Sequence, residues 1–256
     1  MPGPYASVVR FYAQLSDFLP AARRGRSFAH GFSGTPSVKD VIESLGVPHT
    51  EVDWILVDGR PVGFDHRLAD GERLSVYPRF MAIELPTAQR LQPEPLDPPR
   101  FVLDTHLGRL AAYLRLLGHD TLYLHAADDA ELARVSRDAD RTLLTRDRGL
   151  LKRNMVVRAY WVRAESPVEQ IVEVARRFDL ASSAAPFSRC LRCNTPVVRV
   201  DKTRVLPRLE PKTRRYFDEF GHCPTCDRVY WHGSHYARMR ALVDEILDRT
   251  RCERGE

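Results

Sequence analysis

Four of the five cysteines in this 256-residue chain form two C-x-x-C pairs, and this feature limits the fold more strongly than any other. CLRC contains Cys190 and Cys193, CPTC contains Cys223 and Cys226, and 29 residues lie between the pairs. Four thiolates are the number that a closed tetrahedral zinc site requires. Two disulfides disagree with an expected cytoplasmic location, and a single redox motif leaves the second pair unexplained. We therefore predict a structural zinc ion.

The composition is typical of a folded protein without a membrane span. Hydrophobic residues make up 43% of the chain, and no apolar run approaches the roughly 18 residues that cross a bilayer. The N-terminal residues lack a basic stretch followed by an apolar one, so we expect a cytoplasmic protein with no membrane partner. No G-x-G-x-x-G, P-loop or G-x-S-x-G motif is present, which leaves dinucleotide-binding, P-loop and serine-hydrolase functions without support.

Residues 1–82 have the pattern of a small β-grasp domain. A short amphipathic helix opens at Ser37 with Asp40 in its first turn, and strand-like segments lie on both sides of it. The clearest of these segments are SVVRFYAQL, DWILVDGRPV and ERLSVYPRF. The domain resembles the ubiquitin-like sulfur carriers, which need a free C-terminal Gly-Gly. Here the matching strand ends in VYPRF and the chain continues, so we expect an interaction or scaffold module.

Strand and helix patterns alternate between residues 101 and 183. The strand-like stretches are RFVLD, TLYLH, TLLT and VVRAYWV. The helical stretches are THLGRLAAYLRLLG, which Gly118 is placed to end, DDAELARVSRDAD, and SPVEQIVEVARRF, with Pro167 in its first turn. This alternation predicts an α/β fold with a mostly parallel sheet covered on both faces. In such sheets functional groups gather at the carboxyl ends of the strands.

Acidic residues follow three successive strands of this pattern. Asp104 closes the first strand, and Asp147 lies two residues beyond the third. Asp128 and Asp129 open the helix after the second strand. Carboxylates gathered at one rim repel one another unless a divalent cation neutralises them, and Mg²⁺ and Mn²⁺ take oxygen ligands and serve in phosphodiester cleavage. Each acid also has a structural interpretation, as a helix cap, a turn cap or a loop acceptor.

Arginine supplies most of the positive charge. The chain has 39 basic and 34 acidic residues and a formal charge of +5, and only four of the basic residues are lysines. Arginine binds phosphate through a planar fork and stacks on bases, which favours RNA as a partner, although a biased genome composition produces the same excess. The alternative role for the arginines beside the cysteines (Arg189, Arg192 and Arg228) is to neutralise part of the zinc site rather than to bind phosphate. The residues assigned to phosphate contacts are Arg146, Arg148, Arg192 and Arg228.

Aromatic residues follow the second cysteine pair directly. Tyr230 and Trp231 are either core residues of a small ribbon or a platform on which bases stack, and one of them is expected in the core. His235 is a candidate for contacting phosphate or transferring a proton near the carboxylates.

The chain as a whole resembles the Mut7-C RNase domain family. The resemblance is carried by FVLDTHLGRLAAYLRLLGHDTLYL, LLTRDRGLL, the two cysteine pairs and RVYWHGSHYARM, and the N-terminal part resembles the ubiquitin-like domain found fused to that family. It implies a PIN-like fold with a zinc ribbon. It also implies a metal-dependent ribonuclease with Asp104, Asp129 and Asp147 as its acidic positions. Additional candidates at this site are Asp128, Arg146 and His235.

The resemblance predicts four consecutive regions. These are a ubiquitin-like β-grasp domain (1–82), a proline-rich linker (83–100), a PIN-like nuclease domain (101–183) and a zinc ribbon with a C-terminal helix (184–256). The implied cofactors are structural Zn²⁺ and catalytic Mg²⁺ or Mn²⁺, and the N-terminal domain is a candidate site for a protein partner. The competing hypothesis is a non-catalytic RNA- or protein-binding adaptor with a degenerate PIN-like core. A sulfur-transfer accessory is a third hypothesis, but the chain has no Gly-Gly.

Overall fold

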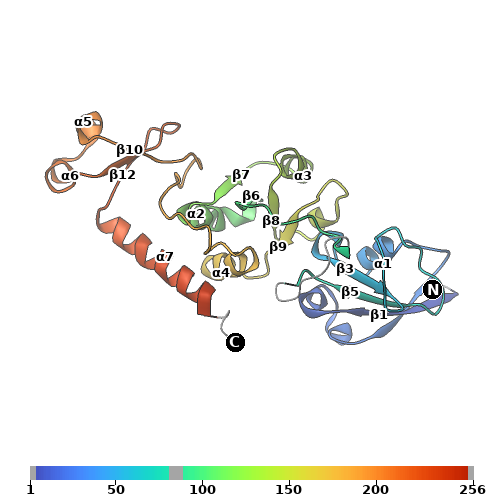
Figure 1. Cartoon of the computed structure of the whole chain (residues 1–256). Helices are drawn as coiled ribbons and strands as arrows, with labels where there is room; N and C mark the ends of the chain where they lie inside the picture. The colour runs from blue at the N-terminus through green and yellow to red at the C-terminus, as the bar shows by residue number, and fades with distance from the viewer. Residues whose placement is uncertain (1–3, 81–88, 253–256) are drawn as a thin grey trace. The chain divides into compact units, whose positions relative to one another are not determined.

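The computed structural model describes residues 4–80 and 89–252, which form two compact units (Figure 1). One unit comprises Met1–Glu94 and Asp147–Trp161, and the other comprises Pro95–Arg146 and Val162–Glu256. The first unit therefore combines the N-terminal region with a segment that is distant in sequence. Part of the predicted proline-rich linker lies outside the described residues.

A five-stranded sheet of order β2-β1-β5-β3-β4 forms the first unit. Its strands are β1 (Tyr5–Phe11), β2 (Phe28–Phe32), β3 (Trp54–Val57), β4 (Arg60–Pro61) and β5 (Arg73–Tyr77). β1 is parallel to β5, whereas the other neighbouring strands are antiparallel. The sheet and α1 (Val38–Ser44) enclose a buried core that includes Val9, Ile42 and Leu74. The predicted small sheet domain is confirmed.

Two predicted strands of this unit are shorter than expected. SVVRFYAQL is extended only as far as Phe11, because Ala13 has a φ of 46° and a 3₁₀ helix, Ala13–Phe18, begins there. DWILVDGRPV is a hairpin of β3 and β4 rather than one strand. Its turn residues Asp58 and Gly59 have φ values of 48° and 79°. A type I′ turn requires positive φ at both positions, and Asp-Gly is a preferred sequence for it.

The segment Asp147–Trp161 belongs to the first unit, and its Trp161 packs against the core of that unit. Leu151 is fully buried, and its carbonyl accepts a hydrogen bond from the Thr50 hydroxyl at 3.3 Å. The Trp161 N–H donates to Glu51 Oε1 at 2.6 Å. This packing joins residues about a hundred positions apart in the sequence.

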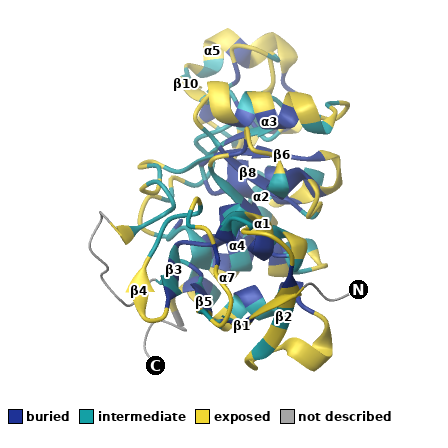
Figure 2. Cartoon of the chain, turned by 90° about the vertical axis from the view of Figure 1, so that its right-hand side faces the viewer, coloured by how far each residue is buried: buried dark blue, intermediate teal, exposed yellow. Residues whose placement is uncertain are grey.

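A parallel sheet forms the centre of the second unit. β6 (Arg100–Leu103) pairs in parallel with β7 (Asp120–Tyr123) on one side and with β8 (Thr142–Thr145) on the other. These three strands follow the order β7-β6-β8. Every residue of β8 is buried, and Figure 2 shows this strand in the colour of buried residues. The predicted α/β fold with a parallel sheet and flanking helices is confirmed.

Three helices begin at residues whose side chains cap them, and Ser37 and Asp128 are among the predicted helix starts. Ser37 accepts a hydrogen bond from the Asp40 N–H at 3.1 Å, and the Asp40 carboxylate accepts one from the Ser37 N–H at 3.2 Å, which completes a capping box. Asp128 caps α3 (Asp129–Asp138), and Ser166 caps α4 (Pro167–Arg177), where Pro167 is the first helical residue.

Four helices, including α2 (Gly108–Leu116), end in the same backbone turn. After each helix one residue adopts a positive φ, and the next N–H bonds to a carbonyl in the last turn, which is the Schellman motif. The residues with positive φ are Gly46 after α1, Gly118 after α2, Asp140 after α3 and Asp179 after α4. The returning hydrogen bonds measure 3.2, 2.9, 2.8 and 3.0 Å, respectively. Gly118 therefore ends its helix as predicted.

A three-stranded antiparallel ribbon follows α4 in the sequence. Its strands are β10 (Val198–Val200), β11 (Phe220–His222) and β12 (Val229–Trp231), with the short helices α5 (Lys202–Val205) and α6 (Pro211–Tyr216) between β10 and β11. The buried residues of its core are Val205, Leu209 and Phe220. α7 (Ser234–Cys252) then packs against α4, where Arg249 and Glu169 form an ion pair at 2.7 Å.

No helix among the described residues is both long enough and apolar enough to cross a membrane.

We predict that Gly118→Ala strongly destabilises the second unit. Gly118 has a φ of +96°, and an added Cβ would meet the Ala185 carbonyl group, with the carbonyl carbon 2.7 Å away. The left-handed conformation and the backbone clash together should lower the free energy of unfolding by about 3 kcal/mol. Gly59→Ala is the matched control, because Gly59 has a φ of +79° with nothing within 4 Å. It should cost only about 1 kcal/mol. Urea denaturation measures both values, and equal losses would contradict the clash.

Candidate metal centre and acidic strand ends

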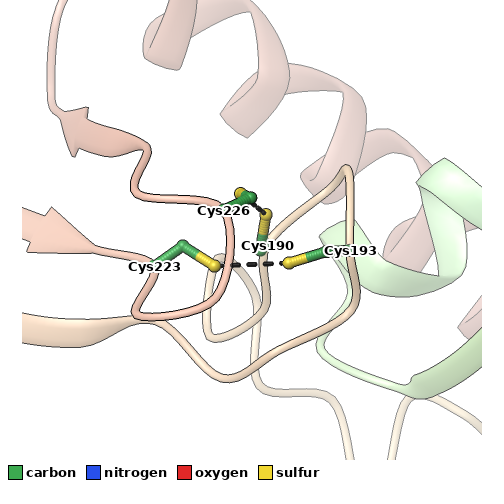
Figure 3. Close-up of side chains that lie close together, drawn as sticks. All are labelled: Cys190, Cys193, Cys223 and Cys226. Atoms are coloured by element: carbon green, nitrogen blue, oxygen red, sulfur yellow. Dashed lines mark hydrogen bonds between the residues drawn. The ribbon is translucent and has the colours of Figure 1, made fainter.

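The four predicted zinc ligands lie together in the ribbon (Figure 3). Their Sγ atoms all lie within 4.8 Å of one another, and none of the four is in a disulfide. Cys190 Sγ is 3.4 Å from Cys226 Sγ, and Cys193 Sγ is 3.3 Å from Cys223 Sγ. A Zn–S length of about 2.3 Å places tetrahedral sulfurs roughly 3.8 Å apart, so a small expansion accommodates the ion. The donor set and its geometry fit zinc.

The two cysteine pairs form matching backbone loops. The N–H of the first cysteine donates to the carbonyl five residues on, in Cys190–Thr195 and in Cys223–Arg228, both at 2.9 Å. The carbonyl of the first cysteine accepts a hydrogen bond at 2.9 Å from the residue after the second cysteine, Asn194 or Asp227. Those two residues have φ values of 70° and 58°. Asn and Asp tolerate this conformation better than most side chains, which explains their place in the loops.

The thiols differ in acidity because their surroundings differ. Burial opposes ionisation of Cys193, but hydrogen bonds with Thr195 outweigh it and lower the pKa of this thiol to about 6. Burial and hydrogen bonds with the neighbouring cysteines raise the pKa of Cys226 to about 12. The Tyr230 hydroxyl donates to Cys190 Sγ at 3.0 Å. A divalent cation favours the thiolate at every position, so its binding would release the remaining protons.

Asn194 connects the first cysteine loop directly to the parallel sheet. Its side-chain carbonyl accepts a hydrogen bond from the Thr121 N–H at 2.9 Å, and its amide donates to Asp120 Oδ1 at 2.8 Å. Asp120 also accepts from Arg141 Nη1 at 2.7 Å. Burial opposes ionisation of Asp120, but these hydrogen bonds outweigh it and lower the pKa of its carboxyl group. Asp120 therefore helps to attach the ribbon to the sheet, because its carboxylate binds the side chain of Asn194.

Arg115 of α2 also connects the parallel-sheet domain to the first cysteine loop. The side chain is only 6% exposed, and its Nη1 donates to the carbonyls of Leu191 and Arg192 at 3.0 Å each. Its Nε donates to the Thr121 carbonyl at 3.0 Å. Sequence reasoning missed Arg115 and Asn194. The available signals were an arginine within the apolar run LRLLG and an asparagine directly after a C-x-x-C pair.

Asp104 lies at the carboxyl end of β6 and is 5% exposed. Its Oδ1 accepts a hydrogen bond from the His106 N–H at 2.9 Å. Its Oδ2 accepts from the Thr145 hydroxyl and from the Arg146 N–H, the latter at 3.2 Å. The carboxylate therefore holds the end of β6 to the end of β8.

Two of the other predicted acids, Asp128 and Asp147, have local hydrogen bonds. Asp128 is exposed and caps α3, accepting from the Glu131 N–H at 2.8 Å. Asp129, the first residue of α3, is half-buried. Asp147 is exposed, and its Oδ1 accepts from the Gly149 N–H at 2.6 Å. Asp147 belongs to the first unit, whereas Asp104 and the two acids of α3 belong to the second.

The predicted cationic residues differ in their surroundings. Arg146 Nη1 donates to the carbonyls of Arg163 and Ala164. The guanidinium of Arg148 lies over the Trp161 ring, 4.0 Å from the ring centroid.

The remaining three predicted contact residues lie in or beside the ribbon. Arg192 and Arg228 are exposed and lie within the two cysteine loops. His235 is exposed in the first turn of α7.

Two family models match the chain, and the matched regions lie in the predicted order along the sequence. Residues 99–243 match the family described as Mut7-C RNAse domain, and residues 5–84 match the family described as Mut7-C ubiquitin. No curated protein matches the chain. A solved structure of small archaeal modifier protein 1 from H. volcanii shares 16% identity over 30% of this chain and 99% of its own, with a TM-score of 0.25, too low to support an argument. Because the first match covers more than half of the chain, the chain belongs to the Mut7-C RNAse domain family.

Proposed function

We propose that the chain is a metal-dependent ribonuclease that hydrolyses RNA phosphodiester bonds beyond the carboxyl ends of β6, β7 and β8. The match of residues 99–243 to the Mut7-C RNAse domain carries this proposal, because the matched range contains Asp104, Asp129 and Asp147. The three acids follow three neighbouring parallel strands. The carboxyl ends of β6 and β7 lie at one edge of the sheet, so the strand order supports Asp104 and Asp129 as ligands of one ion, and Asp147 joins them in the proposal through the family match alone.

The surroundings of Asp104 support a cation at this site. The carboxylate is buried, and its hydrogen bonds come from one hydroxyl and two backbone N–H groups. Among the described residues it forms no ion pair with a cationic side chain. Buried charges in proteins are paired with an opposite charge or coordinate a metal. Carboxylate oxygens are the ligands that Mg²⁺ and Mn²⁺ prefer, so the donor set fits either ion.

The residues of the chain have separate tasks in this proposal. When bound, Mg²⁺ or Mn²⁺ supplies an activated water and stabilises the leaving oxyanion. Asp104 keeps a fixed orientation because Thr145 and the Arg146 N–H hold one of its oxygens. Arg192 and Arg228 hold the phosphate backbone, so affinity for RNA falls as the salt concentration rises.

We also propose that the four cysteines hold a structural zinc ion. The ribbon has few buried apolar residues, namely Val205, Leu209 and Phe220, among those described. So small a core rarely folds without a metal, a disulfide or a partner. A protein partner for the ubiquitin-like domain and a cytoplasmic location remain predictions from the sequence.

The second candidate function is a non-catalytic adaptor that binds RNA or protein. The observation in its favour is that Asp128 and Asp147 both make capping hydrogen bonds, which need no metal. A titration of Mn²⁺ into the zinc-loaded protein separates the two functions. A carboxylate-dependent second metal site favours the nuclease, and its absence favours the adaptor.

We predict that Asp147→Asn abolishes RNA cleavage. Asparagine retains the oxygen that accepts from the Gly149 N–H, so the turn is preserved while the negative charge is lost. Because loss of a residue that merely supports a ligand costs about 10–100-fold, loss of a ligand should lower turnover by about 100-fold or more. The assay uses purified protein, Mn²⁺ and a panel of single-stranded and structured RNAs.

The matched control is Asp244→Asn on the exposed face of α7. Asp244 pairs with Arg240 at 3.1 Å within the same helix, and we expect this variant to cleave at the native rate. Equal cleavage by the native protein and Asp147→Asn would refute the proposed site.

We predict one zinc ion per chain and its loss in Cys223→Ser. Cys223 is fully buried in the cluster, and serine replaces a thiolate with a poorer ligand. The amide protons of β10, β11 and β12 should then exchange rapidly, whereas those of β6 and β8 stay protected. Elemental analysis and hydrogen exchange measure the two effects. Cys252→Ser, which changes the cysteine outside the two pairs, should retain the full zinc content; retention in Cys223→Ser would contradict the four-thiolate site.

A further inference from the structure

Two adjoining hollows on the ribbon share the side chains of Tyr230 and Trp231. The first has a volume of about 260 Å³, and its other aromatic lining residues are Phe187, Phe220, His232 and Tyr236. The second, of about 500 Å³, is lined by Arg192, Arg208, Arg228, Cys226, Asp227 and Val229. An aromatic surface and an arginine-rich surface thus meet at the last two residues of β12.

Two of the aromatic residues that line the first hollow, Trp231 and His232, are exposed. Trp231 is 40% exposed, although it lies at the end of a strand in a small domain. Tyr236 stacks on His232 with ring centroids 4.1 Å apart and contacts Phe187 at 4.5 Å. Gly233 lies beside the indole, since a Cβ there would be 2.9 Å from Trp231 Nε1. The volume is below that of a site for a large ligand, and it suits one planar ring system.

The second hollow contains guanidinium groups that the ribbon does not use for its own ion pairs. Arg208 pairs with Asp227 at 2.8 Å. Neither Arg192 nor Arg228 has a carboxylate partner within the described part of the chain. Two guanidinium groups without carboxylate partners that line the same hollow attract anions, and their planar forks match the oxygens of a phosphate.

We propose that the ribbon binds one nucleotide of single-stranded RNA, with its base in the aromatic hollow and its phosphate between Arg192 and Arg228. This inference rests on the proposed function for the identity of the polymer, and it adds a binding site apart from the acidic strand ends. Stacking uses the face that all bases share, so the site selects unpaired nucleotides rather than a sequence. An apolar peptide is a poorer match for the two hollows, because it has no phosphate to pair with Arg192 and Arg228.

The zinc site shapes this nucleotide site. Tyr230 lines both hollows, and its hydroxyl donates to Cys190 Sγ at 3.0 Å. Cys226 lines the arginine hollow. Release of zinc therefore disturbs the base and phosphate positions together.

The test compares Trp231→Ala with Arg228→Ala in the zinc-loaded full chain. The probe is a fluorescently labelled oligouridine, its abasic counterpart has the same number of phosphates, and no Mg²⁺ or Mn²⁺ is added. Anisotropy should show that Trp231→Ala binds oligouridine about tenfold more weakly, while its affinity for the abasic oligomer is unchanged. Arg228→Ala should weaken the binding of both oligomers and reduce the slope of log K against log salt by about 0.7. Trp231→Phe, which keeps an aromatic face, should recover most of the affinity.

Matched controls come from the same ribbon. Tyr216→Ala removes an aromatic side chain that is 65% exposed on α6, and Arg204→Ala removes an exposed arginine of α5. Both controls should bind oligouridine as the native chain does, and all variants should keep their zinc. The proposal is overturned if Trp231→Ala binds oligouridine with native affinity, or if Trp231→Ala binds both oligomers more weakly by the same factor. This experiment measures binding and not cleavage. If Asp147→Asn cleaved RNA at the native rate, the proposed ribonuclease site would be refuted, but the nucleotide site on the ribbon would still be tested by binding.

Discussion

The hydrogen bond from the Thr121 N–H to the Asn194 side chain joins the first cysteine loop to the edge of the parallel sheet. β7 lies at the edge of the parallel sheet, beside β6, and an edge strand has N–H groups without strand partners. Asn194 supplies the missing acceptor, and its position is fixed by the turn of the first cysteine loop, where its φ is 70°. The loop of the first cysteine pair therefore covers the edge of the sheet at Thr121, on the strand that leads to α3.

The segment Asp147–Trp161 places a second constraint on the proposed site. Asp147 begins a stretch whose Leu151 is buried with the N-terminal domain in the first unit. The hydrogen bonds to Thr50 and Glu51 hold that stretch. The ubiquitin-like domain therefore contributes to the conformation of the residues that follow Asp147, and a partner bound to that domain has a physical route by which to affect them.

Elements with strong local signals could be predicted from the sequence. The capping box at Ser37, the helix end at Gly118 and the cysteine pairs each depend on residues a few positions apart, and these predictions agree with the structure. The sequence did not reveal Asp140 and Asp179 as helix ends, because aspartate adopts positive φ less readily than glycine. The place of Leu151 and the partners of Arg115 depend on contacts far along the chain, which periodicity does not encode.

The capping roles of the acids do not exclude their proposed roles as ligands. A carboxylate offers about four lone-pair directions, and one hydrogen bond from a backbone N–H uses one of them. Such a bond also fixes the orientation of the group, as the Gly149 N–H does for Asp147 and as the Thr145 hydroxyl does for Asp104. An orientation set before binding lowers the conformational entropy that a metal ligand loses. The hydrogen bonds that a purely structural role explains are therefore the same ones that a preorganised metal site requires.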